Sequence, residues 1–267
     1  MSDSELVSAS TTTEKPPEEV IILGSGSGIP SLRRGSAGIV IKMAGEIILL
    51  DTGPGILHKL LTLGITYADI DRVFYTHYHP DHCAELIPML FAMKHGEPRR
   101  EKSLWLFGPP GLKKLYQGLN SLFNENLSPR TYDLRILELW DAEVNFGSWR
   151  IIVRPVVHFG PSLGYRVIFP SGKAIAYPGD TDYCEAVVEL ARGVEALILE
   201  CSFPEEMKLH GHLVPSLCGK IAQEAAPKKL ILTHFYPQWD GHDMLAELGK
   251  YYSGESIPAE DMTKILL

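Results

Sequence analysis

Three histidines and one aspartate fall within six positions of the segment THYHPDH, residues 76–82. His77 and His79 are two residues apart after a β-branched and aromatic run, so an extended backbone would point both imidazoles to one side. Asp81 and His82 follow where a helix can begin, turned toward a second position nearby. Imidazoles and carboxylates bind zinc, but a catalytic zinc needs about three protein ligands, so other parts of the chain must contribute.

The missing ligands stand at the ends of other predicted strands. Short apolar runs of β-favouring residues end at Asp51, His158, Asp180, Glu200 and His234. Two histidines of this set, His158 and His234, can complete two metal sites, and the carboxylate of Asp180 can bridge two ions. The residues therefore predict a dinuclear metal centre.

These strands alternate with amphipathic segments that predict helices. The expected helices cover residues 54–63, 83–94, 111–122, 183–191, 213–225 and 244–251. Continuous apolar strands that alternate with such helices indicate α/β sheets covered by helices. Functional side chains at the ends of several strands then share one edge, where α/β folds usually carry their chemistry. No repeat and no long linker interrupts the pattern, so we expect one domain over residues 20–267.

Composition limits the class of protein. The 267 residues are 45% hydrophobic and 22% charged, as in ordinary globular proteins, and the formal net charge is −8. A protein that follows a long phosphate backbone usually has a basic face. The chain contains no dense Lys/Arg run, so RNA is a less favoured partner than a small molecule.

The chain carries no sequence signal for export or for a membrane. Residues 1–19 lack both a positive start and an apolar stretch, which excludes a signal peptide and predicts a polar, disordered tail. No run of 18 apolar residues predicts a membrane helix. The four cysteines form no CxxC pair, which is typical of reduced thiols. We therefore expect a cytoplasmic protein without a membrane partner.

The ligand types suggest a hydrolytic reaction. An all nitrogen and oxygen site suits two Zn²⁺ ions and also tolerates Mn²⁺, Fe or Ni²⁺. Two metals about 3.5–4 Å apart can hold a hydroxide nucleophile between them and neutralise an attacked phosphate or carbonyl. Asp81 would orient that nucleophile. Glu200 and His212 would form a carboxylate–imidazole pair that protonates the leaving oxygen.

Other sequence features contribute no residues to the predicted metal centre. The run GSGSG at residues 24–28 lacks the third glycine of a dinucleotide fingerprint, because Ile29 occupies that position, so we interpret it as a tight turn near the site. Cys83 and Cys201 lie next to motif residues without a basic partner and are expected to be buried. His210 can line the cleft.

Several segments resemble the motifs of the metallo-β-lactamase fold superfamily. THYHPDH is similar to its H-x-H-x-D-H signature, and DTGPG (51–55), GDT (179–181) and LTHF (232–235) follow in the family's order. The chain most resembles the ribonuclease Z branch. That likeness rests on GSGSGIPSLRRGSAG (24–38), HFGPSLGYRV (158–167), LECSF (199–203) and HLVPS (212–216).

The resemblance implies a four-layer αββα sandwich with two zinc ions between its sheets, and often a homodimer. It implies one zinc on His77, His79 and His158, and another on Asp81, His82 and His234. Asp180 would bridge the two ions, and Asp51 would orient a ligand histidine through a hydrogen bond.

One departure from the branch concerns the substrate. Ribonuclease Z commonly has a long basic arm between the third-motif histidine and the bridging aspartate, and here only 21 residues separate His158 from Asp180. We therefore expect a dinuclear metal-dependent phosphodiesterase that acts on a small or cyclic nucleotide. The alternatives are a tRNA 3′-processing endoribonuclease, a lactonase or other carboxylic-ester hydrolase of the same fold, and a metal-binding protein without hydrolytic activity.

Overall fold

The computed structural model of the chain describes residues 18–97 and 99–267. The disordered tail predicted over residues 1–19 lies outside this range except for its last two residues, and the first strand begins at Glu19.

Fourteen strands in the described part form two sheets of seven. The first sheet contains β1 (Glu19–Gly24), β2 (Gly38–Met43), β3 (Glu46–Leu50), β4 (Ile70–Phe74), β5 (Leu104–Gly108), β6 (Leu134–Glu138) and β14 (Thr263–Ile265). The second contains β7 (Ala142–Asn145), β8 (Arg150–Pro155), β9 (Leu163–Ile168), β10 (Ala174–Tyr177), β11 (Ala196–Glu200), β12 (Lys229–Thr233) and β13 (Ser256–Pro258). Their spatial orders are β14-β1-β2-β3-β4-β5-β6 and β13-β12-β11-β10-β9-β8-β7.

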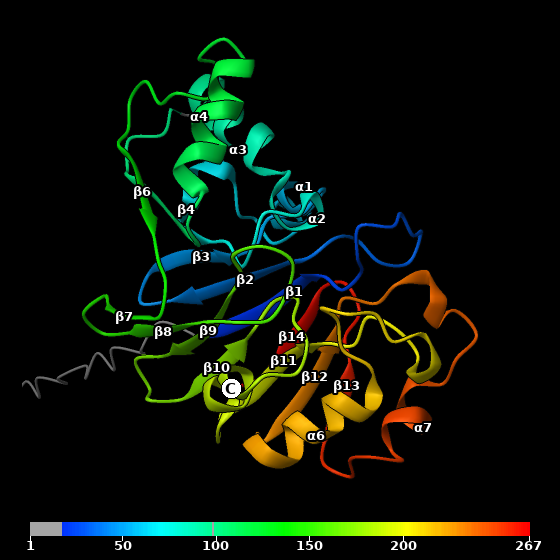
Figure 1. Cartoon of the computed structure of the whole chain (residues 1–267). Helices are drawn as coiled ribbons and strands as arrows, with labels where there is room; N and C mark the ends of the chain where they lie inside the picture. The colour runs from blue at the N-terminus through cyan, green and yellow to red at the C-terminus, as the bar shows by residue number, and fades with distance from the viewer. Residues whose placement is uncertain (1–17, 98) are drawn as a thin grey trace, which may run out of the picture.

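Helices cover the outer face of each sheet. They are α1 (Ile56–Thr62), α2 (Pro80–Cys83), α3 (Leu86–His95), α4 (Leu112–Leu122), α5 (Glu185–Ala191), α6 (Pro215–Ala225) and α7 (Met244–Leu248). Figure 1 shows α1 to α4 together above the first sheet and α6 and α7 below the second. One apolar core lies between the sheets, and one more lies between each sheet and its helices. The expected αββα sandwich is confirmed.

The strand directions bring the expected site residues to one edge. β3 and β4 are parallel in the first sheet, and β10, β11 and β12 are parallel in the second. β8 runs in the direction of β10, because both are antiparallel to β9. Within each sheet the carboxyl ends of these strands thus lie at one edge. The two edges meet at the same end of the sandwich, because His77 after β4 lies beside His158 after β8 and Asp180 after β10.

Two sequence expectations need correction in their boundaries. The helix expected over residues 83–94 is two helices, because Pro80 starts α2 before Cys83 and the chain turns at Ala84 and Glu85 before α3. The carboxy-terminal segment SIPAEDMTKILL, whose alternation predicts one closing edge strand with a turn, forms two edge strands, since β13 closes the second sheet beside β12 and β14 closes the first beside β1. The 21 residues between His158 and Asp180, enough for two strands and a turn, contain the antiparallel pair β9 and β10.

Among the described residues, no helix is long and apolar enough to cross a membrane.

Candidate metal centre

The segment THYHPDH leaves β4 at the edge where the two sheets open. Pro80 is the first residue of α2, a position that tolerates proline because its missing N–H has no helical partner. The turn is fixed from outside: the Thr52 N–H donates to the His82 carbonyl at 2.7 Å, and the Glu85 N–H donates to the Thr52 carbonyl at 3.0 Å. The DTGPG loop therefore holds the histidine-rich loop in place.

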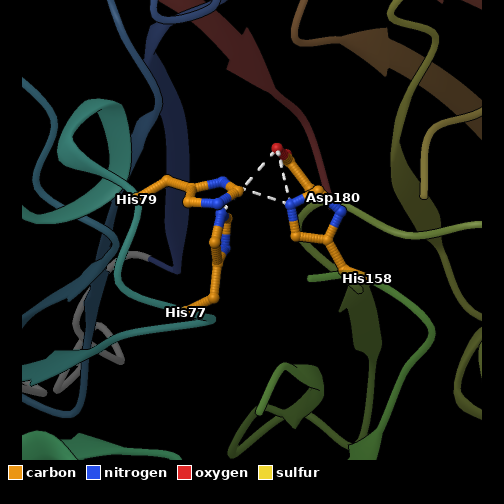
Figure 2. Close-up of side chains that lie close together, drawn as sticks. All are labelled: His77, His79, His158 and Asp180. Atoms are coloured by element: carbon orange, nitrogen blue, oxygen red, sulfur yellow. Dashed lines mark hydrogen bonds and ion pairs between the residues drawn. The ribbon is translucent and has the colours of Figure 1, made fainter. Parts of the chain in front are cut away.

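One group of ligand atoms consists of His77, His79, His158 and Asp180, whose side chains converge in Figure 2. His79 Nδ1 lies 3.2 Å from His158 Nε2. Asp180 Oδ2 lies 3.9 Å from His77 Nε2 and 3.8 Å from His158 Nε2. Ligand atoms around a tetrahedral zinc are about 3.3 Å apart, so the spacing suits one such ion.

A second group consists of Asp81, His82 and His234. His82 Nε2 lies 3.2 Å from His234 Nε2. Asp81 Oδ2 lies 3.4 Å from His234 Nε2 and 3.8 Å from His82 Nε2. This spacing again suits one tetrahedral ion.

Asp180 stands between the two groups and faces each with a different oxygen. Its Oδ2 faces His77 and His158, as described, and its Oδ1 lies 3.3 Å from His82 Nε2 and 3.4 Å from His234 Nε2. The side chain is 3% exposed. A carboxylate with one oxygen turned to each set has the geometry of a bridging ligand.

Asp51 fixes the orientation of His82. Its Oδ2 accepts hydrogen bonds from His82 Nδ1 at 2.8 Å, from the Thr76 hydroxyl at 2.8 Å and from the Tyr177 hydroxyl at 2.9 Å. Because Thr76 donates to Asp51, its oxygen can accept from His77 Nδ1 at 3.0 Å. In both histidines the hydrogen is thus placed on Nδ1, which leaves a free lone pair on Nε2.

Gly211 and Ser202 do the same for His158 and His234. His158 Nδ1 donates to the carbonyl of Gly211 at 2.7 Å. His234 Nδ1 donates to the Ser202 hydroxyl at 3.0 Å, and Ser202 donates onward to Glu200. These bonds leave a lone pair on Nε2 of His158 and of His234, and both lone pairs face the ligand groups.

The arrangement fits bound cations. With their hydrogens on Nδ1, His82 and His234 face each other through Nε2 lone pairs that repel one another. The buried Nε2 of His77 has no hydrogen-bond partner among the described residues. A buried polar atom without a partner is costly, and a metal ion at each group would satisfy all of these atoms together.

Burial and charge tune the protonation of the ligands. Burial lowers the pKa of His77 well below its usual value, and it lowers the pKa of His158 as well. Burial would raise the pKa of Asp180, but the positive charge that His234 and His82 carry when protonated outweighs it and holds that pKa well below its usual range. Metal ions bound in place of those protons would supply the same positive charge. Neutral imidazoles and an ionised carboxylate are the forms that bind metal.

Two site residues adopt a backbone conformation that is rare for residues other than glycine. Asp51 has φ 58° and His234 has φ 59°, both at the end of a strand. Such conformations cost on the order of 1–3 kcal/mol and persist where surrounding contacts enforce them. Here the strained backbone directs His234 into the second group of ligand atoms and directs Asp51 toward His82.

The pair expected from Glu200 and His212 lies beside the second ligand group. His212 Nδ1 is 3.2 Å from both oxygens of Glu200. Glu200 is held by the backbone N–H groups of Thr181 at 2.7 Å and Leu213 at 3.1 Å. Burial would lower the pKa of His212, but its hydrogen bond and charge interaction with Glu200 raise it. A His212 ligand atom also lies within 4.8 Å of those of Asp180 and His234.

The other sequence expectations have mixed outcomes. Cys83 and Cys201 are buried, as expected. His210 is exposed and turns to Asp182 at 3.6 Å rather than to the ligand groups. The GSGSG turn does reach the site, since a Cβ on Gly28 would lie 3.2 Å from Asp81 Cγ.

Sequence reasoning missed four supporting groups: Thr76, Tyr177, Ser202 and the Gly211 carbonyl. A signal existed for Ser202, because residues two apart on an extended strand end share a face and Ser202 follows Glu200 by two. No pattern in the sequence identifies a backbone carbonyl such as that of Gly211.

Comparison with known proteins agrees with this geometry. A family model described as the β-lactamase superfamily domain matches residues 46–235. A ribonuclease Z of Methanothermobacter thermautotrophicus is 26% identical over 92% of this chain and 96% of its own length. An uncharacterized protein of Mycobacterium tuberculosis is 33% identical over 78% of this chain and 76% of its own length.

Solved structures show the same fold. The metallo-β-lactamase fold protein YhfI of Bacillus subtilis superposes with a TM-score of 0.81 at 23% identity, over 94% of this chain and 99% of the other. The short form of human tRNase Z superposes with a TM-score of 0.75 at 22% identity, over 93% and 98%. The chain belongs to the metallo-β-lactamase fold superfamily, resembles the ribonucleases Z within it over most of its length, and is a metal-dependent hydrolase.

Proposed function

We propose that the chain is a dinuclear phosphodiesterase that hydrolyses small nucleotides, with a 3′,5′-cyclic nucleotide as the preferred kind. The observation that carries the proposal is Asp180, whose two oxygens face two separate groups of histidines. The two groups are His77, His79 and His158 on one side and Asp81, His82 and His234 on the other. Zinc is the expected metal, and Mn²⁺, Fe or Ni²⁺ would also suit nitrogen and oxygen ligands.

The metal ions and the side chains would have different roles in catalysis. Two bound ions supply a water nucleophile at neutral pH and neutralise charge on the phosphate. Asp81 lies at the edge of the second group, 13% exposed in its side chain, where it can orient an attacking water. Glu200 holds His212 so that its imidazolium can give a proton to the leaving oxygen.

The surroundings favour a small nucleotide over a long RNA. Phe159 is 56% exposed, and its ring lies 5.2 Å from that of His158, so an apolar surface stands beside the ligands. Lys208, a cation of the loop that leads to Gly211, is bound to Asp182 at 2.8 Å. Aromatic surfaces stack bases, whereas a polynucleotide needs a track of free cations.

The relatives named ribonuclease Z favour a second candidate, tRNA 3′-end processing, because they align over 92% of this chain. The net charge of −8 and the short connection between His158 and Asp180 speak against it. A lactonase would use the same ligands without needing the Glu200–His212 pair.

A substrate panel tests the proposal. We expect zinc-loaded protein to hydrolyse bis(p-nitrophenyl) phosphate and a 3′,5′-cyclic nucleotide, and His77→Ala to lose both activities because one ligand group is broken. His58→Ala, an exposed histidine of α1, is the matched control and should keep them.

The same panel includes precursor tRNA and a simple lactone. Preference for precursor tRNA over the cyclic nucleotide would favour the second candidate. Turnover of the lactone alone would contradict the phosphodiesterase and keep the metal-dependent hydrolase.

A further inference from the structure

We infer that a cavity behind His212 is a subsite for the nucleobase of the substrate. The inference rests on the proposed phosphodiesterase function and adds a second recognition site to it. The cavity has a volume of about 370 Å³ and is lined by Phe203, Glu206, Met207, Lys208, Leu209 and Gln238. Half of the lining is apolar (Phe203, Met207 and Leu209) and half is polar (Glu206, Lys208 and Gln238), so the cavity offers both a surface for a flat ring and groups that can orient it.

A chain of aromatic rings connects the cavity to the reacting centre. The ring of Phe203 lies edge-on to His212 at 5.7 Å and stacks on Tyr236 at 4.5 Å. Tyr236 in turn lies 5.6 Å from the ring of His234. The ring of Phe203, which lines the cavity, therefore lies next to the imidazole of His212, and Tyr236 connects it to the ring of His234.

The position of His212 indicates which part of the substrate would enter the cavity. A group that protonates the leaving oxygen must be within hydrogen-bond reach of it. The leaving oxygen of a nucleotide phosphodiester belongs to the sugar that carries the base. The nucleoside part of the substrate therefore lies on the His212 side of the phosphate, which is the side of the cavity.

The wall of the cavity is built to stay in place. Lys208 donates to Asp182 at 2.8 Å and to the Leu209 carbonyl at 2.7 Å, and the Gly211 N–H donates to Asp182 at 3.0 Å. The lysine charge is thereby neutralised within the wall, and it is not free for a second phosphate. A preformed wall costs a ligand little ordering entropy.

The exposed lining suits a neutral planar base. Met207 is 42% and Leu209 is 54% exposed, so both offer apolar surface that a base can cover. Glu206 and Gln238 are exposed polar residues of the same cavity, and a carboxylate and an amide can accept hydrogen bonds from the amino group of a base. The negative charge of Glu206 disfavours a further phosphate.

Binding of two reaction products isolates the contribution of the base. The probes are adenosine 5′-monophosphate and ribose 5-phosphate, which differ by the base alone, measured by titration calorimetry on zinc-loaded protein. We expect the base to strengthen binding about tenfold or more in the wild type, as burial of apolar surface predicts. In Met207→Ala/Leu209→Ala this advantage should fall about tenfold, with ribose 5-phosphate affinity unchanged. Leu61→Ala, an exposed leucine of α1, is the matched control and should behave as the wild type.

Three results would overturn the subsite. The first is equal binding of the two probes to the wild type, and the second is an unchanged advantage of the base in the double variant. The third is an equal gain for hexyl phosphate, which would show an apolar site without selectivity for a base. If diester hydrolysis persists in any of these cases, the phosphodiesterase stands and the base subsite fails. If neither probe binds and no diester is hydrolysed, both fail.

Discussion

Asp180→Asn is expected to lower kcat/KM for diester hydrolysis by about a thousandfold or more and to reduce the bound metal below two ions per chain. The amide has one acceptor oxygen, and its NH₂ group would face one of the two ligand groups with donors. The substitution also removes the negative charge of an almost fully buried carboxylate, which would offset the charge of two divalent ions. Losing several kcal/mol of metal-dependent charge stabilisation corresponds to a change of this size.

Kinetics on bis(p-nitrophenyl) phosphate and metal analysis of the same sample check this expectation. Asp133→Asn changes an exposed aspartate that is 72% accessible in its side chain, and it should match the wild type in both. An Asp180→Asn protein with two firmly bound ions and full activity would contradict the bridging role.

His212→Gln is expected to lower kcat/KM by about 10²- to 10⁴-fold for a cyclic nucleotide, which has an alkoxide leaving group. The loss should be much smaller for bis(p-nitrophenyl) phosphate, since p-nitrophenolate departs without a proton. The metal content should stay at two ions per chain. The reason is the pair with Glu200, which raises the pKa of His212 and keeps the ring in its acidic form.

The exposed neighbour His210 provides the control, because His210→Gln removes an imidazole two residues away that is 75% exposed in its side chain. Loss of metal in His212→Gln would contradict the acid role and make His212 a ligand, which its proximity to Asp180 and His234 allows. An equal loss on both diesters would also contradict it.

Much of the fold follows from patterns that the sequence carries openly. Strands such as β1 and β11 are apolar except for a glutamate at one end, because both faces of each sheet are covered, by the other sheet and by helices. A polar residue at the end of such a strand then lies at the edge of the sheet, where the strand ends meet. For this reason the sequence alone predicts that Asp180, His234 and Glu200 share one site.

The rest depends on contacts between distant segments. The split between α2 and α3 follows from hydrogen bonds of Thr52 to His82 and Glu85, which no local propensity encodes. The Gly211 carbonyl that orients His158 comes from a loop 53 residues later, and its backbone φ of 81° is set by that loop. The homodimer expected from the resemblance stays a prediction.

Metal stoichiometry tests the central claim most directly. Protein stripped with a chelator would be titrated with Zn²⁺ while bound metal and hydrolysis of bis(p-nitrophenyl) phosphate are followed together. We expect activity to return with the metal and to reach its maximum at about two ions per chain, because the two ligand groups share Asp180. Full activity at one ion per chain, or two bound ions without diester hydrolysis, would contradict a dinuclear phosphodiesterase.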